Sequence, residues 1–297
     1  MLGWLSAQTG AQVTAETLDG LAQKKVSAMI DANHLRRITE RLAAAGAVRE
    51  QARLASLGLP HAGDWLHALP SHALGLQLRP AEFIMAAKLR LGMPVYETAG
   101  PCPACLKHCD ALGDHALCCA YQGERISRHN RLRDTLYHTA VSAALGPAIE
   151  GRFLLPGNDR RPADVFIPGW TGGKDSALDV TVTHPLQEAT VVGAAKTAGH
   201  AAGEAYHRKM EASAADCRAE GIEFLPLAAE SLGGWHPVAV HQVDKLAAAL
   251  ARHSGEDERV ATRHLWQRLA VTLQKGNAAL LNGRKPIFPT PATSGQF

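Results

Sequence analysis

Two short apolar segments of the sequence each carry a single acid: Asp164 lies within residues 161–167 (RPADVFI), and Asp179 lies within residues 177–183 (ALDVTVT). β-Branched and apolar residues alternate with other residues in both segments, which predicts two strands. A carboxylate on a buried strand is costly without a partner, so two on neighbouring strands suggest a shared Mg²⁺ or Mn²⁺ ion. The alternative is that both acids accept hydrogen bonds from backbone or arginine.

A second set of candidate ligands precedes these acids. Five of the six cysteines lie between Cys102 and Cys119, with a histidine among them. The Cys102-x2-Cys105 turn can place two thiolates on one tetrahedral ion, and His115 and Cys119, at His-x3-Cys spacing, would complete a structural zinc site. Cys118 competes with Cys119 for the fourth position. Two further candidates within the cluster are His108 and Cys109. Because such a site is closed, we expect the zinc to fold this module rather than to catalyse.

An arginine-rich segment follows the cysteines directly and leads into a helix predicted to end near residue 145. Its basic residues could bind nucleic-acid phosphates or could pair with nearby acids. We expect the nucleic-acid-binding residues to be Arg125, Arg128, His129, Arg131 and Arg133.

The elements that must position these residues form a recognisable order. After the arginine-rich helix we expect a strand at 148–155 that carries Glu150, then the strands with Asp164 and Asp179, joined by the turn residues 168–173. A long alanine-rich helix is predicted at 187–219, a strand at 222–227 and mainly helix at 238–282. Upstream, helices are predicted at 17–29, 32–57 and 81–91.

This helix-strand-strand-strand-helix-strand order, with an acid on three successive strands, resembles the core of the restriction-endonuclease-like (PD-(D/E)XK) nucleases. The residues that carry the resemblance are Pro162-Ala163-Asp164 and Asp179-Val180-Thr181. It implies Mg²⁺-dependent hydrolysis of DNA phosphodiesters, with Asp164 and Asp179 as metal ligands and Glu150 as a third carboxylate. The fold class expected is therefore α/β (α+β), with an αβββαβ core.

The sequence departs from the nuclease pattern at one position. The family places a lysine two residues after the second acid, where this chain has Thr181. Related nucleases supply the lysine from the next helix, and counting along a continuous helix that returns at about 1.5 Å per residue leads to Lys196. The apolar stripe of that helix instead turns Lys209 toward the sheet. The two lysines would lie about 20 Å apart, so only one can reach the acids.

The order of modules also resembles the C-terminal end of the polyproteins of site-specific non-LTR retrotransposons, which nick their target DNA. The further matching residues are Asp114-His115-Ala116-Leu117, Arg128-His129-Asn130 and Glu230-Ser-Leu-Gly-Gly-Trp235. In that family an Arg-Lys pair stands at the place of Arg208-Lys209, which favours Lys209. The resemblance implies DNA as the partner, possible contact with element RNA and a reverse transcriptase module elsewhere, and a nuclear location.

Composition bounds these interpretations. The net charge of +3 means that any nucleic-acid surface must be a local patch. No apolar stretch is long enough for a membrane span, and the N-terminus lacks the features of a signal peptide, so we expect an intracellular protein without membrane contact. The predicted organisation is a helical region at 1–95, a zinc knuckle at 96–122, a nuclease core at 123–235, C-terminal helices at 236–285 and a tail at 286–297.

Two other functions compete with the endonuclease. Because Thr181 replaces the family's lysine and no polymerase signature is present, the chain could be an inactive, zinc-containing nucleic-acid-binding protein derived from such an element. The third hypothesis is a zinc-stabilised interaction module without a nucleic-acid role. A lysine amine close to the two aspartates would favour the endonuclease.

Overall fold

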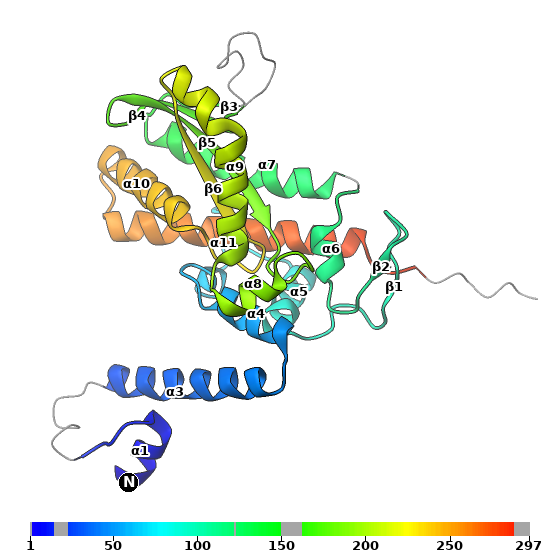
Figure 1. The fold of residues 1–297 in the computed structure, drawn as a ribbon. Coiled ribbons are helices and arrows are strands. Elements are labelled where there is room, and N and C mark those ends of the chain that lie inside the picture. The colour runs from blue at the N-terminus through cyan, green and yellow to red at the C-terminus, as the bar shows by residue number, and fades with distance from the viewer. Residues whose placement is uncertain (1, 15–22, 122, 150–161, 288–297) are drawn as a thin grey trace, which may run out of the picture.

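The computed structural model describes residues 2–14, 23–121, 123–149 and 162–287. Within them the chain forms a mixed α/β fold, as the sequence predicts: a four-stranded sheet packed between helices, and a small two-stranded sheet at the cysteine cluster (Figure 1). Glu150, most of the predicted strand at 148–155 and most of the predicted tail lie outside the described residues.

The larger sheet has the strand order β3-β4-β5-β6. Its strands are β3 (Ala148–Ile149), β4 (Val165–Thr171), β5 (Lys174–Thr183) and β6 (Glu223–Glu230). β3, β4 and β5 pair antiparallel, and β5 pairs with β6 in parallel. The connection between β4 and β5 is shorter than predicted, because β4 continues to Thr171 and only Gly172 and Gly173 make the turn. Both glycines have positive φ (58° and 85°), the conformation that tight hairpin turns require.

The two faces of this sheet are covered by different helices. The main core lies between one face and α7 (Glu124–Ser142), α10 (Pro237–Ser254) and α11 (Glu258–Gly283). The other face, with Ala177, Phe224 and Ala228, packs against α9 (His200–Ala219). α9 also provides the crossover that the parallel pairing of β5 and β6 requires. The observed order α7-β3-β4-β5-α8-α9-β6 follows the order predicted from the sequence except that two helices, α8 (Val191–Lys196) and α9, stand where one was predicted.

The alanine-rich segment after β5 is not the single helix that was predicted. It forms α8 (Val191–Lys196) and α9, separated by a break at which Gly199 has a φ of +78°. A left-handed residue cannot continue a right-handed helix, so the two helices run in different directions. α8 packs against α4 (Val48–Leu57), where Ala52, Leu186 and Ala194 share a small core. Counting residues along one continuous helix was therefore wrong.

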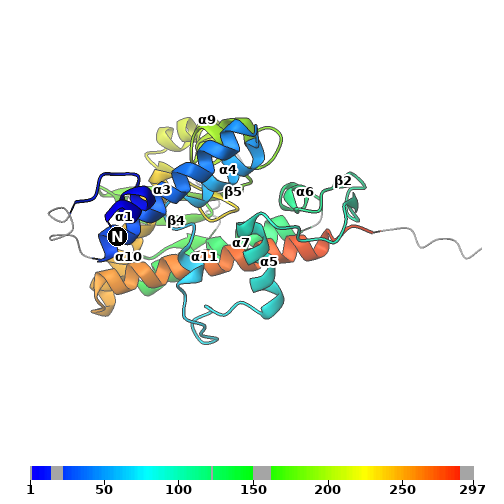
Figure 2. The ribbon, with the colours of Figure 1, turned by 90° about the horizontal axis from the view of Figure 1, so that it is seen from below.

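The remaining elements lie at the two ends of the sheet-based core. The N-terminal part consists of α1 (Leu2–Thr9), α3 (Gln23–Ala44), α4, the 3-10 helix η1 (Asp64–Leu66) and α5 (Pro80–Leu91). α5 packs along α11, whereas α1 and α3 lie apart from the sheet-based core (Figures 1 and 2). The cysteine cluster contains β1 (Gly100–Pro101), β2 (His108–Cys109) and α6 (Asp114–Cys118), beside the C-terminal end of α11.

Candidate active site and metal centre

Asp164 and Asp179 stand opposite each other on neighbouring chain segments. Val165 pairs with Leu178, so the residue before Val165 faces the residue after Leu178. Asp164 directly precedes β4, and its backbone N–H donates to the carbonyl of Leu178 (2.9 Å). Its carboxylate oxygen Oδ2 accepts from the N–H of Val180 (2.6 Å). The tight hairpin thus fixes both acids by strand register, and the backbone satisfies one oxygen of Asp164.

Lys209 reaches these acids from α9. Its Nζ lies 2.9 Å from Oδ2 of Asp179 and 3.2 Å from Oδ1. α9 lies across the face of the sheet that carries Ala177 and Asp179, so a lysine on the inner side of this helix meets the second acid. Thr181, where the nuclease pattern has its lysine, lines the same pocket as Lys209. Lys209 therefore supplies an amine to the pocket that Thr181 lines.

His129 is a part of this site that the sequence did not place there. It was predicted to bind nucleic acid, and in the structure its Nε2 lies 3.0 Å from Oδ1 of Asp164. α7 presents His129 at the end of the sheet where Asp164 precedes β4. Burial lowers the pKa of the imidazole, but the hydrogen bond and charge of Asp164 outweigh burial, so the pKa lies above its ordinary value.

The buried carboxylate of Asp179 has fewer hydrogen-bond donors among the described residues than it could accept from. Burial raises the pKa of its carboxyl to about 6, with Asp164 adding to the rise and Lys209 opposing it. Oδ2 makes an ion pair with Lys209 but accepts no well-formed hydrogen bond from the described residues. A buried carboxylate of this kind, beside a second carboxylate, fits a hard divalent cation with oxygen ligands such as Mg²⁺ or Mn²⁺.

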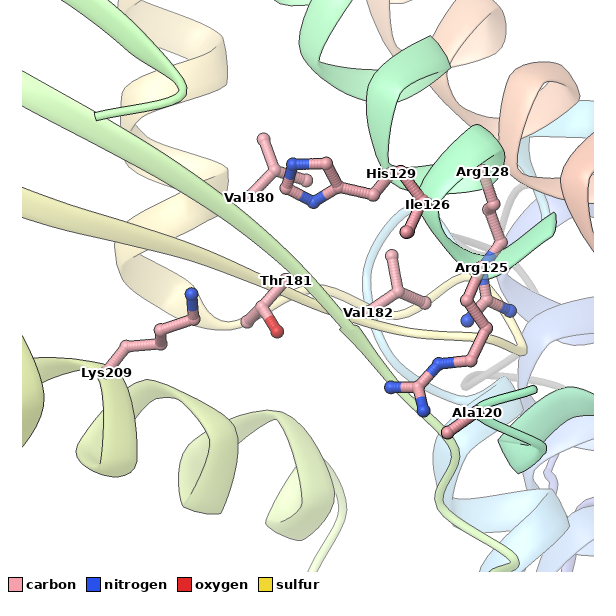
Figure 3. Close-up of a pocket in the computed structure, with 9 residues that line it drawn as sticks. All are labelled: Ala120, Arg125, Ile126, Arg128, His129, Val180, Thr181, Val182 and Lys209. Carbon is pink, nitrogen blue, oxygen red and sulfur yellow. The ribbon is translucent and has the colours of Figure 1, made fainter. Parts of the chain in front are cut away.

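A pocket of about 430 Å³ opens beside the two acids. Figure 3 shows that α7 supplies one side of it and that Lys209 of α9 stands on the other, with Thr181 of β5 between them. Cations predominate among its polar side chains, and none of its lining residues is acidic. The lining residues are Ala120, Arg125, Ile126, Arg128, His129, Val180, Thr181, Val182 and Lys209.

The other basic residues predicted for the site fall into different places. Lys196 is exposed at the end of α8, and within the described residues no hydrogen bond or ion pair joins it to Asp164 or Asp179. Arg131 is exposed and lines a separate pocket with His138 and Arg268. Arg133 pairs with Asp134 (2.8 Å). The arginine-rich segment therefore does not form one continuous surface.

Arg128 requires a correction. As a nucleic-acid contact it was expected on the surface, yet it is only 2% exposed. Its guanidinium donates to Oδ1 of Asn277 on α11 (2.8 Å). It lines the pocket beside the acids, where a ligand could meet it. The sequence carries no local signal for this burial, because the partner residue lies 149 positions away.

The four predicted zinc ligands come together in one group. Within the described residues the candidate metal-ligand cluster consists of Cys102, Cys105, His115 and Cys119, whose ligand atoms all lie within 4.8 Å of one another. The Sγ atoms of Cys102 and Cys119 are 4.0 Å apart, close to the roughly 3.8 Å that two thiolates on a tetrahedral zinc would have. The chemistry of the set, three sulfurs and one imidazole, suits zinc. Cys118 is not part of the group.

Residues within the cysteine module and Arg284 from outside it hold this group in place. Asp110 accepts hydrogen bonds from the backbone N–H groups of Asp114 (3.1 Å) and His115 (2.8 Å), which fixes the start of α6. Burial raises the pKa of the Cys119 thiol, but hydrogen bonds from the Tyr121 backbone and from Arg284 outweigh it and lower that pKa below its ordinary value. Arg284, fully buried and paired with Glu124 (2.7 Å), gives no sign of this role in the sequence.

Glu230, which belongs to the motif 230–235, lies away from both groups. It ends β6 and is fully buried. Its carboxylate accepts hydrogen bonds from the hydroxyl of Ser56 (2.5 Å) and the N–H of Ala202 (3.3 Å), and burial raises its pKa. Glu230 therefore links α4 to the beginning of α9.

Comparison with known proteins adds no assignment. No protein-family model matches the sequence, and no curated protein is significantly similar to it. In the described part of the chain no helix combines the length and apolar character that crossing a bilayer requires.

Proposed function

We propose that this chain is a metal-dependent DNA endonuclease of retrotransposon origin, with a structural zinc module beside its catalytic core. The observation that carries the proposal is the meeting of two acids with one lysine: Asp164 and Asp179 oppose each other across a hairpin, and Nζ of Lys209 lies 2.9 Å from Asp179. Their sequence order and the helix-strand order around them support the restriction-endonuclease-like assignment. The zinc module would be held by Cys102, Cys105, His115 and Cys119.

Each residue of the site has a part in phosphodiester hydrolysis. Asp164 and Asp179 would hold a Mg²⁺ or Mn²⁺ ion, which would polarise the phosphate and lower the pKa of an attacking water. The Lys209 amine can donate a hydrogen bond to that water and neutralise charge that develops on the phosphate oxygens. His129 orients Asp164 by the contact at 3.0 Å. Glu150, a further predicted carboxylate, lies outside the described residues.

The partners follow from the same proposal. DNA is the substrate, and element RNA and a reverse transcriptase module on the parent or another chain are the further partners that the retrotransposon resemblance implies. A target in chromosomal DNA places the protein in the nucleus.

The test is nicking of supercoiled plasmid by the zinc-loaded protein with added Mg²⁺ or Mn²⁺. We expect the wild type to nick and both Asp164→Asn and Asp179→Asn to lose nicking, because each removes one charged metal ligand. Asp175→Asn is the matched control: Asp175 lies on the same strand as Asp179 but is exposed at the hairpin turn, where it accepts from Gly169. Plasmid that the wild type shifts on a gel and never nicks would indicate a binding protein instead.

A further inference from the structure

Arg128 is a buried cation that pairs with no carboxylate in the described part of the chain. Its side chain is 2% exposed, and no ion pair joins it to an acid within the described residues. One nitrogen donates to Asn277, whereas Nε has no hydrogen-bond partner. Burial and the neighbouring charge of Arg125 lower the pKa of Arg128 to about 10, so the guanidinium remains charged at neutral pH. An unpaired buried charge is destabilising, so a charge at this position is consistent with a functional role for Arg128.

The surroundings of Arg128 are built to hold it in one position. Gly276 of α11 leaves room for its aliphatic part, since a Cβ at Gly276 would lie 2.4 Å from Cγ of Arg128. The amide of Asn277 donates from Nδ2 to the carbonyl of Ser231 (2.7 Å), so its oxygen is turned toward the guanidinium. Neither α11 residue supplies a negative charge. The arginine is thus fixed by neutral groups and keeps its charge available.

Arg128 is one of the residues that line the pocket beside the two acids. Arg125 and Arg128 of α7 line it on one side and Lys209 lines it on the other (Figure 3). Arg125 is exposed and donates to the carbonyl of Cys118 (3.2 Å), a neutral partner. Three cations around a cavity without an acidic lining residue favour binding of an anion, and of the three only Lys209 pairs with an acid in the described part of the chain. The volume of about 430 Å³ accommodates a phosphate with part of its sugar.

We propose that Arg128 and Arg125 form a phosphate-binding subsite that holds a DNA backbone phosphate next to the one cleaved at Asp164 and Asp179. The inference rests on the proposed endonuclease function. It adds that Arg128 and Arg125 set the position of the DNA strand relative to the two aspartates. A guanidinium fixed by Asn277 offers a paired, planar set of donors that matches phosphate oxygens. Arg128 is a positioning residue for the substrate, and the hydrolytic step itself belongs to the aspartates and Lys209.

The first test is binding of a short DNA duplex, followed by fluorescence anisotropy at several salt concentrations without added Mg²⁺ or Mn²⁺. We expect Arg128→Met to weaken binding roughly tenfold, as loss of a charged hydrogen bond would. It should also reduce the slope of log K against log salt by about one, because one phosphate contact is lost. Arg252→Met removes an exposed arginine of α10, an element that does not line this pocket, and it should leave the slope unchanged. Equal slopes for Arg128→Met and wild type overturn the subsite.

A second variant keeps the test decisive if Arg128→Met does not fold, as judged by zinc content and thermal unfolding. Asn277→Asp retains the arginine but places a carboxylate beside it, so we expect duplex binding to fall through neutralisation of the guanidinium. Duplex binding by folded Asn277→Asp that equals wild type would contradict the proposal.

Inorganic phosphate tests whether the natural ligand of the pocket is a free anion or a phosphate of nucleic acid. At constant ionic strength it should raise the unfolding temperature of the wild type and leave Arg128→Met unchanged. Stabilisation by phosphate with duplex binding that is independent of Arg128 would assign the pocket to a free anion and overturn the DNA subsite. The two proposals fail separately: wild-type protein that binds DNA through Arg128 but never nicks contradicts the nuclease alone. Nicking that survives Arg128→Met with unchanged binding contradicts the subsite alone.

Discussion

At the scale of single residues, the proposed site takes its lysine amine from a different element than the nuclease pattern does. In the nuclease pattern the lysine follows the second acid on the same strand, whereas here Thr181 holds that position and the amine comes from α9. Thr181 and Lys209 line one pocket. An amine from either residue could therefore reach the same space, and this exchangeability can be tested directly.

Replacing Lys209 with methionine should reduce nicking by roughly 10²-fold or more, because one charged donor to the developing phosphate charge is lost. Adding Thr181→Lys to the Lys209→Met protein should restore part of the rate, since the new amine enters the same pocket. The measurement is the initial rate of plasmid nicking in Mg²⁺. Lys174→Met, on an exposed lysine at the start of β5, serves as the control. A Lys209→Met protein as active as wild type would remove Lys209 from the mechanism.

The Cys3His group, the proposed zinc site, gives a second residue-scale prediction. Cys118 and Cys119 are adjacent, but only Cys119 lies in the group with Cys102, Cys105 and His115. Cys119→Ser should therefore purify with much less zinc than wild type, whereas Cys118→Ser should retain it. Zinc is measured by release to a colorimetric chelator under denaturing conditions. Equal loss in both serine variants would mean that the two cysteines exchange as ligands, contrary to the geometry.

At the scale of elements, the sequence predicts a feature well when the residues that form it lie close together in the chain. The Cys-x2-Cys and His-x3-Cys spacings act within one short segment, and the structure brings together the four ligands that were chosen. The hairpin that opposes the two aspartates is equally local. In contrast, Lys196 and Lys209 could not be separated by counting, because the break at Gly199 redirects the helix. Gly199 is a local signal for such a break, but the place of α8 after it is set by packing against the distant helix α4.

The burial of Arg128 shows the same limit more strongly. An arginine within a run of basic residues is expected to be exposed. Here its aliphatic part enters a space that Gly276 leaves on α11, and its head meets Asn277. Both partners come from the distant end of the chain, so only the packing of α7 on α11 reveals them.

This packing leads to a prediction about α11. Gly276→Ala should destabilise the fold by roughly 1–3 kcal/mol, because the new Cβ would overlap Cγ of Arg128 and force helix or arginine to move. Gly203→Ala in α9 is the matched control, since nothing lies within 4 Å of a Cβ there. That change should be neutral or stabilising by up to about 1 kcal/mol through helix propensity. Free energies of unfolding from urea titrations provide the comparison, and equal values for the two variants would contradict the predicted overlap.

At the scale of the whole molecule, the cysteine module is joined to several distant parts of the chain. Asp114, next to the ligand His115, accepts from Arg49 of α4 (2.6 Å) and contacts Nε2 of His184 (3.2 Å) after β5. The other ring nitrogen of His184 contacts the hydroxyl of Ser231 after β6 (2.6 Å). The module is thus tied to the N-terminal helices and to the end of the sheet at once.

The module also shares its core with the end of α11. Cys102, Cys109 and Cys119 pack in one cluster with Leu280 and Leu281. The hydroxyl of Tyr96 donates to the carbonyl of Leu281 (2.7 Å). Since α11 also carries Gly276 and Asn277, which contact Arg128, neighbouring turns of one helix hold both the Cys3His group and this arginine. Loss of zinc should therefore destabilise the end of α11 as well as the cysteine segment.

Removing zinc with a chelator should lower the unfolding temperature of the entire chain within a single transition. A structural zinc contributes folding free energy directly, and a loss of several kcal/mol corresponds to roughly 10 °C at about 2–4 °C per kcal/mol. Amide hydrogen exchange should rise at residues 277–284 as well as in the cysteine segment, because both depend on one shared core. Cys118→Ser, loaded with zinc, provides the control for loss of a thiol alone. An unchanged main transition, with faster exchange confined to residues 96–121, would show that the module folds independently of α11.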